Sequence, residues 1–432
     1  MMRKEQQLSP EELIELSVES LGARGDGIAQ YRGAPVFLPF TVPGDRVRAR
    51  LGARRAGGRE GRLVDRLASG PERADPPCRH FGACGGCTLQ HLGASSYQAV
   101  KLGALRAALE RVRVDPGVVE PLRVVPPARR RARVGLVRPG HPLLPARIGF
   151  RARSRHNLVD ITECLILEAP LFDVVTKLRQ VAADLLPTGG SAEATLTHTD
   201  SGVDLLIEAV ERPELGALEA LVAFAEECDL ARIVWRSSGE EIPVLERRPV
   251  RVLLSGVAVP IPPGAFLQAS RAAEMILVDE VLSGIGTLRP ALDLFAGLGT
   301  FTFALAQTGP VHAVEGEERA AAALARAAMG RPGVAPRVTV ERRDLFRDPL
   351  PPQWSARYAA AVFDPPRAGA ARVAEALAAS ALDTIVAVSC NAATFARDAA
   401  KLIAGGYRLE RVTPVDQFVW TPHLELVAVF RR

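Results

Sequence analysis

The sequence predicts an α/β fold in the carboxyl-terminal part of the chain, preceded by a mixed α+β middle region and a small β-barrel. After about residue 290, short apolar runs alternate with alanine-rich helical stretches, which is typical of βαβ units and a parallel sheet. Near the amino end, short β-rich runs are broken by glycine and Pro-Gly turns, which indicates a barrel. With 48% apolar residues among 432, the chain can bury large cores, so an intrinsically disordered protein is excluded.

The length and these pattern changes predict three domains. The barrel is expected over residues 8–68, the mixed domain over 69–260 and the α/β domain over 261–432, with 69–77 as a linker. No apolar run approaches the roughly 18 residues that span a membrane. The amino end also lacks the apolar stretch of a secretory signal. We therefore expect a cytoplasmic, monomeric protein without membrane contact.

Arginines cluster in two stretches of the chain. Residues 46–66 contain eight arginines against Glu60 and Asp65, and residues 121–156 contain ten arginines and no acidic residue. The net charge of +5 is compatible with a polyanionic partner without requiring one. The clusters favour a phosphate-binding surface, as in nucleic-acid recognition, over an ordinary solvated face.

Three of the six cysteines lie close together in the segment CRHFGACGGC. Its glycines allow a tight backbone that could direct the thiolates of Cys78, Cys84 and Cys87 to one centre, with Cys164 as a fourth ligand. Thiolate sites select zinc or iron–sulfur clusters, and the spacing leaves both open. The alternative is that these cysteines are small buried apolar residues. Cys228 lies in a helix-like apolar pattern and is expected to fill a core.

The first strand of the α/β region leads into a glycine turn, DLFAGLGT, at residues 293–300. Gly297 and Gly299 would let the backbone approach a ligand at the carboxyl end of a strand. Glu315, at the end of the next strand, is placed to accept hydrogen bonds from a ribose diol. The third glycine of a dinucleotide site is missing, which argues against NAD and favours S-adenosylmethionine. The alternative is a tight turn without function.

Two further strands end in polar groups, at Asp364 and at Cys390. Because parallel strands converge at one edge, both should face the same crevice. Cys390 is then a candidate nucleophile if its thiolate is stabilised, or else a buried core cysteine. His423 and Glu425 lie two residues apart on a strand and should share one face, either as a solvated edge or with a general base reaching the crevice.

Together these segments resemble the RNA uracil-C5 methyltransferase family, specifically its iron–sulfur-containing 23S ribosomal RNA branch. The resemblance covers most of the chain and is carried by CRHFGACGGC, IGFRARSRHNLVDITEC, FLQAS, DLFAGLGTF, FDPPR, SCN and HLE in the family's order. It implies a TRAM domain (an OB-like RNA-binding barrel), a mixed α+β central domain with a [4Fe–4S] cluster, and a Rossmann-like class I S-adenosylmethionine-dependent methyltransferase domain.

The resemblance also implies roles for individual residues. Cys390 would be the nucleophile and Glu425 the base. Contacts to S-adenosylmethionine would come from Gln268, Phe295, Thr300, Glu315, Asp344 and Asp364. The cluster would be held by Cys78, Cys84, Cys87 and Cys164. The chain departs from the family pattern at Ser270, Ala392 and Val419, where asparagine, proline and proline are more usual, which leaves fine substrate contacts in doubt.

The implied reaction is methylation of carbon 5 of a uridine in RNA, with 23S ribosomal RNA as the expected substrate and transfer RNA as the alternative. The cluster would shape an RNA-contacting surface. Two rivals are an RNA amino-methyltransferase, which needs neither Cys390 nor Glu425, and a non-catalytic RNA-binding or assembly factor. An iron–sulfur redox protein is disfavoured because the chain shows no flavin or nicotinamide motif.

Overall fold

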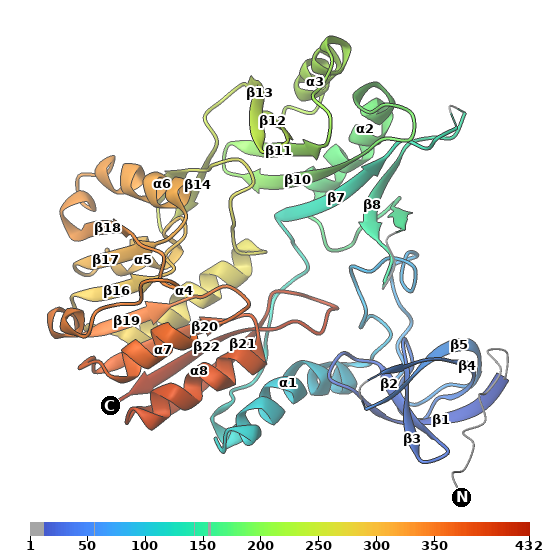
Figure 1. Ribbon diagram of the computed structural model, residues 1–432, viewed down its shortest axis with the longest axis horizontal. Helices are drawn as coiled ribbons and strands as arrows, with labels where there is room; N and C mark the ends of the chain where they lie inside the picture. The colour runs from blue at the N-terminus through green and yellow to red at the C-terminus, as the bar shows by residue number, and fades with distance from the viewer. Residues whose placement is uncertain (1–12, 56, 142, 154–156) are drawn as a thin grey trace, which may run out of the picture. The chain divides into compact units, whose positions relative to one another are not determined.

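The computed structural model describes residues 13–55, 57–141, 143–153 and 157–432 (Figure 1). These form two compact units. The first contains the described residues up to Ala107 together with Trp420–Pro422, and the second contains Ala108–Val419 and His423–Arg432. The expected boundaries after residues 68 and 260 fall inside these units, so the three-domain division stays a prediction. Residues 8–12 of the expected barrel domain lie outside the described residues.

The first unit contains a closed five-stranded barrel with the strand order β1-β2-β3-β5-β4 (blue in Figure 1). Its strands are β1 (Leu13–Leu21), β2 (Gly27–Tyr31), β3 (Ala34–Leu38), β4 (Arg46–Arg55) and β5 (Gly58–Ala68). Alternate residues of β1, such as Ile14 and Leu16, are buried inside, as the twofold period of a strand requires. A Cβ atom at Gly61 would lie 2.5 Å from the Leu38 side chain, so the barrel has no room for a larger residue at this position. The predicted barrel is confirmed.

The segment after β5 is fastened to the barrel, although its composition is typical of a linker. Asp45 is fully buried, and its carboxylate accepts a hydrogen bond from the Gly70 N–H at 2.8 Å and pairs with Arg73. Charge-assisted hydrogen bonds to a buried carboxylate are among the stronger polar contacts in proteins. The helix α1 (Ala94–Arg111) then leads from the first unit into the second.

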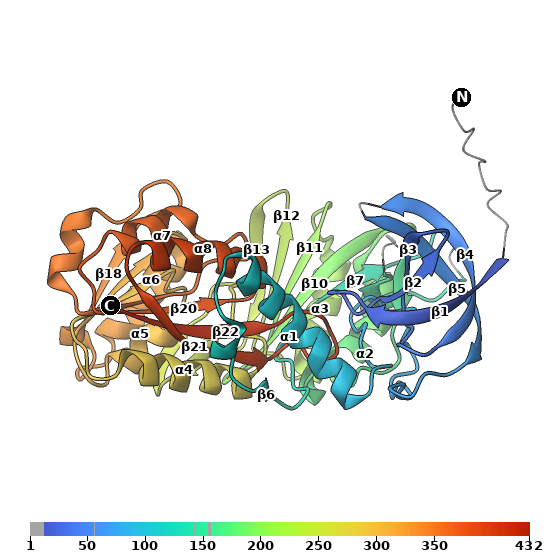
Figure 2. The ribbon, with the colours of Figure 1, turned by 90° about the horizontal axis from the view of Figure 1, so that it is seen from below.

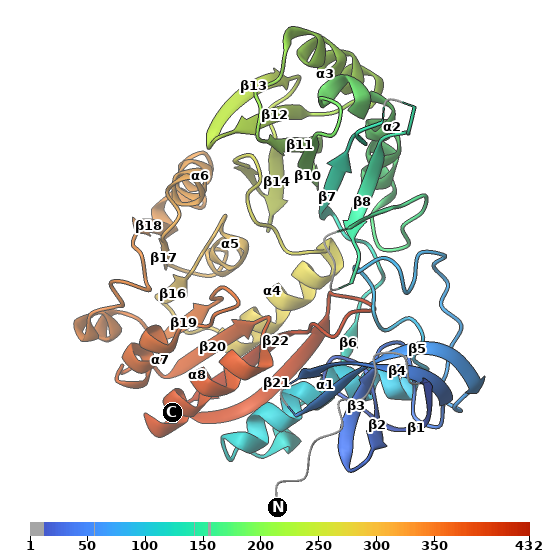
Figure 3. The same ribbon diagram turned by 45° about the vertical axis from the view of Figure 1, so that its right-hand side comes forward.

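The amino-terminal part of the second unit is a seven-stranded sheet with the order β13-β12-β11-β10-β7-β8-β9. Helices α2 and α3 pack together on one face of this sheet, and their apolar sides form its core (Figure 3). The elements are β7 (Arg131–Val137), β8 (Arg147–Arg151), β9 (Leu158–Asp160), α2 (Ala169–Leu185), β10 (Ser191–Thr199), β11 (Gly202–Ala209), α3 (Leu215–Glu227), β12 (Arg232–Ser237) and β13 (Glu240–Glu246). The half-buried Cys228 ends α3 and packs against this core, as predicted.

The carboxyl-terminal part of the second unit is an eight-stranded sheet with the order β18-β17-β16-β19-β20-β22-β21-β6. The five strands from β18 to β20 are parallel, and β22 is antiparallel to both of its neighbours. The strands are β6 (Arg123–Val124), β16 (Ala291–Leu294), β17 (Val311–Glu315), β18 (Val338–Arg342), β19 (Ala360–Phe363), β20 (Thr384–Ser389), β21 (Arg408–Asp416) and β22 (Glu425–Arg431). The predicted parallel sheet is confirmed.

Helices cover both faces of this sheet. In Figure 2, α4 lies on one face, and α7 and α8 lie on the other. A hairpin of β14 (Arg251–Leu254) and β15 (Val257–Pro260) packs against α6 within the same core. The helices are α4 (Arg271–Ile285), α5 (Thr300–Leu305), α6 (Glu318–Met329), α7 (Ala371–Ala378) and α8 (Ala392–Ala404), with 3₁₀ turns at Pro116–Val118, Ala335–Arg337 and Pro352–Arg357. Within the described residues, the helices are too short or too polar to cross a membrane.

Candidate active site

The sequence-predicted residues of the α/β region lie where neighbouring strands end. Glu315 is the last residue of β17, Asp344 follows shortly after β18, Asp364 follows β19 directly, and Cys390 follows β20 directly. Because these strands are parallel neighbours, their carboxyl ends form one edge of the sheet, which is where open α/β sheets bind ligands. The expectation that Asp364 and Cys390 share an edge is therefore confirmed.

Glu425 reaches the same edge from a strand that runs the opposite way. It is the first residue of β22, and Leu426 pairs with Ser389 of β20. In this antiparallel register, the next position places Cys390 opposite Glu425. The two residues are 35 positions apart in sequence, and the sheet topology brings them together.

The Cys390 side chain is half-buried. Burial raises the pKa of the Cys390 thiol to about 11, the carboxyl groups of Glu425 and Asp364 add to this rise, and Arg367 opposes it. The thiolate is the nucleophilic form of cysteine. At neutral pH Cys390 is therefore a thiol, not the stabilised thiolate that a preactivated nucleophile would show. Its proton has to leave as the sulfur reacts.

The Glu425 carboxyl group is buried, with 4% of the residue exposed. Burial and the neighbouring Asp364 raise the pKa of Glu425 well above its ordinary value, and a hydrogen bond from Gln417 opposes the rise. The Gln417 Nε2 donates to Glu425 Oε2 at 2.6 Å. A carboxyl group whose pKa is raised toward neutrality is suited to accept or return a proton in catalysis.

Gln417 is a residue that the sequence reasoning missed. It follows β21, in which Val415 pairs with Glu425, and it is 7% exposed. The signal that could have found it is an uncharged amide between Asp416 and the apolar residues that follow it in VDQFVW. Buried amides need hydrogen-bond partners, so such a residue indicates a polar network.

Gln268 and two aspartates continue this network. The Gln268 Oε1 accepts from Gln417 Nε2 at 3.0 Å, and its Nε2 donates to Asp364 Oδ2 at 3.3 Å. Burial raises the pKa of Asp364 to about 7, with Asp293 adding to the rise. Burial also raises the pKa of Asp293 to about 7, against a hydrogen bond from Thr302. These buried carboxyl groups therefore titrate near neutral pH.

The glycine turn adopts the backbone that the sequence predicted. Gly297 and Gly299 have φ values of 55° and 98°, and Phe295 also has a positive φ of 63°. A non-glycine residue in this region is strained, and such strain is concentrated at functional sites. The carboxylate of Glu315 accepts the N–H groups of Gly297 at 2.8 Å and Glu317 at 2.7 Å. Each oxygen keeps a further lone pair for a ligand.

An aromatic pair stands beside this turn. The rings of Phe295 and Phe346 have centroids 5.3 Å apart, and Phe346 is 44% exposed. Asp344 is exposed. Its Oδ1 accepts the Phe346 N–H at 3.0 Å, which stabilises the turn from Asp344 to Phe346. Thr300 is the first residue of α5, at the end of the glycine turn. The sequence reasoning missed Phe346, although an exposed aromatic residue just after Asp344 is the type that stacks on a planar ligand.

Asn391 connects the cysteine loop to the Asp364 loop. Its Oδ1 accepts the N–H of Ala393 at 3.0 Å and so caps α8, while its Nδ2 donates to the Arg367 carbonyl at 3.2 Å. Side-chain caps of this kind typically contribute about 1 kcal/mol to helix stability. The polar residue beside Cys390 therefore fixes where β20 ends and α8 begins.

The expectation that His423 shares a face with Glu425 is wrong. His423 precedes β22 and is exposed, while Glu425 is buried inside the sheet. The twofold period applies only within a strand, and the strand begins at Glu425. Only Glu425 of this pair lies at the edge of the sheet beside Cys390.

The cysteine prediction concerns Cys78, Cys84 and Cys87 in the first unit and Cys164 in the second. All four side chains are half-buried and none forms a disulfide. The Gly86 N–H donates to Cys84 Sγ at 3.4 Å, which is the kind of contact that ligating sulfurs receive. Within the described residues, no three Cys, His, Asp or Glu side chains gather in a group that could hold a metal ion. The donor types fit a cluster.

The arginine-rich stretch 121–156 is partly internal, which corrects its interpretation as one phosphate-binding surface. Arg130 is 1% exposed, pairs with Glu274 at 2.5 Å and donates to the Gln268 carbonyl at 3.1 Å. Arg131 and Arg138 donate to main-chain carbonyl groups as well. These three arginines satisfy carbonyl groups inside the fold. Arg155 lies outside the described residues.

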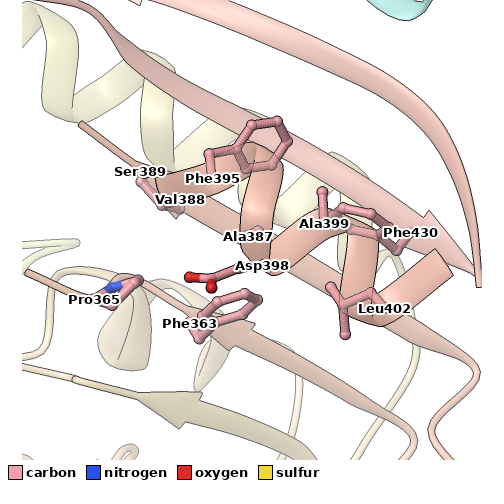
Figure 4. Close-up of a pocket in the computed structure, with 10 residues that line it drawn as sticks. All are labelled: Phe363, Pro365, Ala387, Val388, Ser389, Phe395, Asp398, Ala399, Leu402 and Phe430. Atoms are coloured by element: carbon pink, nitrogen blue, oxygen red, sulfur yellow. The ribbon is translucent and has the colours of Figure 1, made fainter. Parts of the chain in front are cut away.

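A small apolar cavity lies between α8 and the sheet (Figure 4). Its wall includes Ser389, the residue before Cys390, and the polar side chain of Asp398. Asp398 Oδ2 accepts the Ala370 N–H at 2.8 Å and Oδ1 accepts from Arg397 at 2.9 Å, so this carboxylate is satisfied within the fold. The lining residues are Phe363, Pro365, Ala387, Val388, Ser389, Phe395, Asp398, Ala399, Leu402 and Phe430. The cavity belongs to the packing of α8 on the sheet.

The chain is similar to known RNA methyltransferases. A family model described as tRNA (Uracil-5-)-methyltransferase matches residues 355–432. A protein of Rhizobium meliloti, named an uncharacterized RNA methyltransferase, is 40% identical and covers 96% of this chain and 99% of its own length. The 23S rRNA (uracil(1939)-C(5))-methyltransferase RlmD of Chromohalobacter salexigens is 34% identical, over 96% of this chain and 89% of its own.

Among solved structures, the tRNA (uracil-54, C5)-methyltransferase of Pyrococcus abyssi, crystallised with S-adenosyl-L-homocysteine, superposes with a TM-score of 0.73. It is 24% identical and covers 96% of this chain and 100% of its own. This likeness confirms the predicted methyltransferase fold.

Proposed function

Because this chain belongs to the RNA (uracil-5-)-methyltransferase family, we propose that it methylates carbon 5 of a uridine in 23S ribosomal RNA, with S-adenosylmethionine as methyl donor. The observation that carries the proposal is the register of β20 and β22, which sets a cysteine opposite a buried carboxyl group at the ligand-binding edge of the sheet. The RNA target is supported by the 34% identical relative, whose name specifies 23S rRNA.

The residues around the glycine turn fit such a donor. Asp293 Oδ1 is buried and has no hydrogen-bond partner within the described residues, and Gly297 has open space where a side chain would stand. S-adenosylmethionine bound here would supply an electrophilic methyl group on a sulfonium. The residues proposed to hold it are Gln268, Phe295, Thr300, Glu315, Asp344 and Asp364.

Cys390 performs the first step of the proposed reaction. Its sulfur bonds to carbon 6 of the uracil, and the electrons of the 5,6 double bond move toward carbon 5 and the carbonyl oxygen, which makes carbon 5 nucleophilic. Carbon 5 then takes the methyl group as the methyl–sulfonium bond breaks. Because burial raises the pKa of the Cys390 thiol, its proton passes to solvent as the sulfur bonds to carbon 6 and the ring takes up the negative charge.

Glu425 performs the second step. After methyl transfer, carbon 5 carries both the methyl group and its original proton, so the adduct cannot resolve until a base removes that proton. Glu425 accepts it, the carbon 6–sulfur bond breaks, and the 5,6 double bond forms again. Proton transfer by a positioned carboxylate typically accelerates such a step by about 10²–10⁴-fold.

A uracil stacked in RNA cannot present carbon 6 to a thiol, so the target nucleotide has to leave the stack. Unstacking costs a few kcal/mol, and least for a base in a loop. Phosphate contacts offset that cost. We propose that the barrel is a TRAM-type RNA-binding module, supported by the exposed arginines Arg46, Arg48 and Arg50 on its strand β4.

The nucleophile is tested with RNA that contains 5-fluorouridine, because fluorine at carbon 5 cannot be removed as a proton and traps the adduct. We expect a denaturation-resistant complex with the wild type and with Cys228→Ala, a matched half-buried cysteine at the end of α3. Cys390→Ala should form none. An adduct that persists in Cys390→Ala would refute the nucleophile and favour an amino-methyltransferase, and absence of S-adenosylmethionine binding would favour a non-catalytic RNA-binding factor.

The RNA target is tested by mapping 5-methyluridine by mass spectrometry in RNA from cells that lack the gene. We expect one ribosomal 5-methyluridine to disappear and to return when the wild-type gene, but not the Cys390→Ala gene, is restored. Loss from transfer RNA alone would overturn the ribosomal assignment while leaving the reaction intact.

We further propose that Cys78, Cys84, Cys87 and Cys164 hold a [4Fe–4S] cluster that shapes an RNA-contacting surface. No redox step is assigned to it. The donor chemistry supports the proposal, since four thiolates suit iron–sulfur clusters. Protein purified without oxygen should contain iron and sulfide and show broad visible absorbance, all lost in Cys84→Ser, with weaker RNA binding. Zinc without sulfide would decide for the alternative metal.

A further inference from the structure

We propose that Gln417 is a positioning residue of the reaction, which holds the Glu425 carboxyl group and the Gln268 side chain in one fixed arrangement. The inference rests on the proposed function, because it gives Glu425 the role of base. It goes beyond that function because neither the sequence motifs nor the resemblance assigned a role to Gln417. It is carried by three hydrogen bonds of one buried side chain.

The chemistry of its partners fixes the orientation of the Gln417 amide. The main-chain N–H of Ala269 donates to Gln417 Oε1 at 3.1 Å, and a main-chain N–H can only donate. The oxygen must therefore face Ala269, and Nε2 must face Glu425. Its two hydrogens go to Glu425 Oε2 at 2.6 Å and to Gln268 Oε1 at 3.0 Å. Every hydrogen of this amide is used, and a rotated amide would set two oxygens against each other.

This arrangement selects one oxygen of Glu425 for the reaction. Oε2 is held by Gln417, while Oε1 has no hydrogen-bond partner within the described residues. The same contact keeps Gln268 from turning, because its Oε1 is occupied and its Nε2 is left to donate to Asp364. One side chain thus orients both a base and a proposed donor-binding residue.

The surroundings of Glu425 explain why such a donor is needed. The titratable groups that face it are Asp364 at the end of β19 and Cys390 at the end of β20, and Asp293 in turn faces Asp364. Arg367 acts on Cys390 and opposes these acids. Burial and Asp364 favour the protonated form of Glu425, which cannot act as a base. The Gln417 N–H favours the charged form.

The test is Gln417→Met, which keeps the length of the side chain and removes the amide. Its matched control is Gln307→Met, the same change at an exposed amide that donates to the Ser255 carbonyl. We expect Gln417→Met still to form the 5-fluorouridine adduct at saturating S-adenosylmethionine, because that step does not use the base. Turnover on ordinary RNA should fall about tenfold at neutral pH, and the acidic limb of its pH profile should move up by about one unit.

Gln417→Glu extends the test in case Gln417→Met loses stability. An ionised carboxylate at this position cannot donate and adds a like charge, so the acidic limb should move further than in Gln417→Met. Unchanged turnover and pH profiles in both variants, with Glu425→Gln impaired, would overturn the positioning role alone. A Glu425→Gln variant with normal turnover would overturn the base itself, and the positioning role with it.

Discussion

The barrel and the central region each contain an arginine-rich stretch, but individual arginines in the two stretches have opposite structural roles. On β4, Arg46, Arg48 and Arg50 alternate with the buried Val47 and Ala49, so they point outward. Across the β4–β5 pair, Arg50 lies directly opposite Arg62, and both are exposed. Like charges directly opposite in a sheet destabilise it, so the pair is better explained by binding a polyanion than by folding.

Three arginines of the central region, Arg130, Arg131 and Arg138, donate to carbonyl groups inside the fold. Arg130 is the extreme case, since its buried guanidinium contacts Glu274 and the main chain that carries Gln268. The planar guanidinium has five donors, which allows it to satisfy several carbonyl oxygens that a lysine could not reach together. The comparison teaches that an acid-free arginine run indicates phosphate binding only when its side chains are shown to face outward.

The largest expected effect comes from Arg130→Met. The change leaves the Glu274 carboxylate without its partner, in a place where burial already raises the pKa of Glu274. Breaking a buried ion pair in this way typically costs about 3–5 kcal/mol in the free energy of unfolding. Urea denaturation measures it, with Arg133→Met, 57% exposed at the side chain, as a control that should change little. Equal losses in both variants would contradict the comparison.

A smaller loss of stability is expected for Arg138→Met. Its Nη1 donates to the carbonyl groups of Ala183 and Leu186, the latter at 2.7 Å, and so closes the end of α2. Hydrogen bonds to a charged group contribute about 1.5–3 kcal/mol. Denaturation should show a loss in this range, and hydrogen exchange should speed up at the end of α2. The exposed Arg147→Met should leave both unchanged.

Burial raises the pKa values of the acids of the site, so their contribution to stability depends on pH. Arginine side chains stay charged over the whole range. The pKa values of Asp293 and Asp364 are raised to about 7, so between pH 4 and 7 the folded protein binds more protons than the unfolded chain. Their contribution to stability is therefore largest at the acidic end of this range and falls as the pH rises through about 7.

Denaturation curves at several pH values test this dependence. Asp293→Asn should flatten it, because the amide carries no titratable proton, whereas the exposed control Glu226→Gln should keep the wild-type slope. A wild-type stability that rises over the same pH range would show that these acids are ionised in the folded protein.

The smallest effect on stability is expected in the barrel. Arg50→Gln combined with Arg62→Gln should change the free energy of unfolding by less than about 0.5 kcal/mol, because both side chains are exposed. RNA affinity should fall, and the slope of log affinity against log salt should shrink by about 2 if each arginine neutralises one phosphate. Arg24→Gln, an exposed arginine in a barrel loop, is the matched control. Unchanged affinity and slope would remove the barrel from the RNA-binding surface.

The local patterns of the sequence determined the elements and the residues that end them. Alternation of apolar runs with alanine-rich stretches predicted the parallel sheet, and chain order alone placed Asp364 and Cys390 at strand ends. These predictions succeed because strand and helix periods act over a few residues. The same local reasoning failed at His423, because it could not locate the start of β22 within two residues.

Only the tertiary structure decided which of these residues meet and how they are held. The register of β20 and β22 brings Cys390 opposite Glu425, and Gln417 joins Glu425 to Gln268 across 149 positions of sequence. Likewise, no local pattern distinguishes the buried Arg130 from the exposed Arg133 three residues later. Hydrogen bonds between distant segments depend on how the whole sheet packs. Such packing produces no periodic pattern in the sequence of either segment, so local patterns cannot predict it.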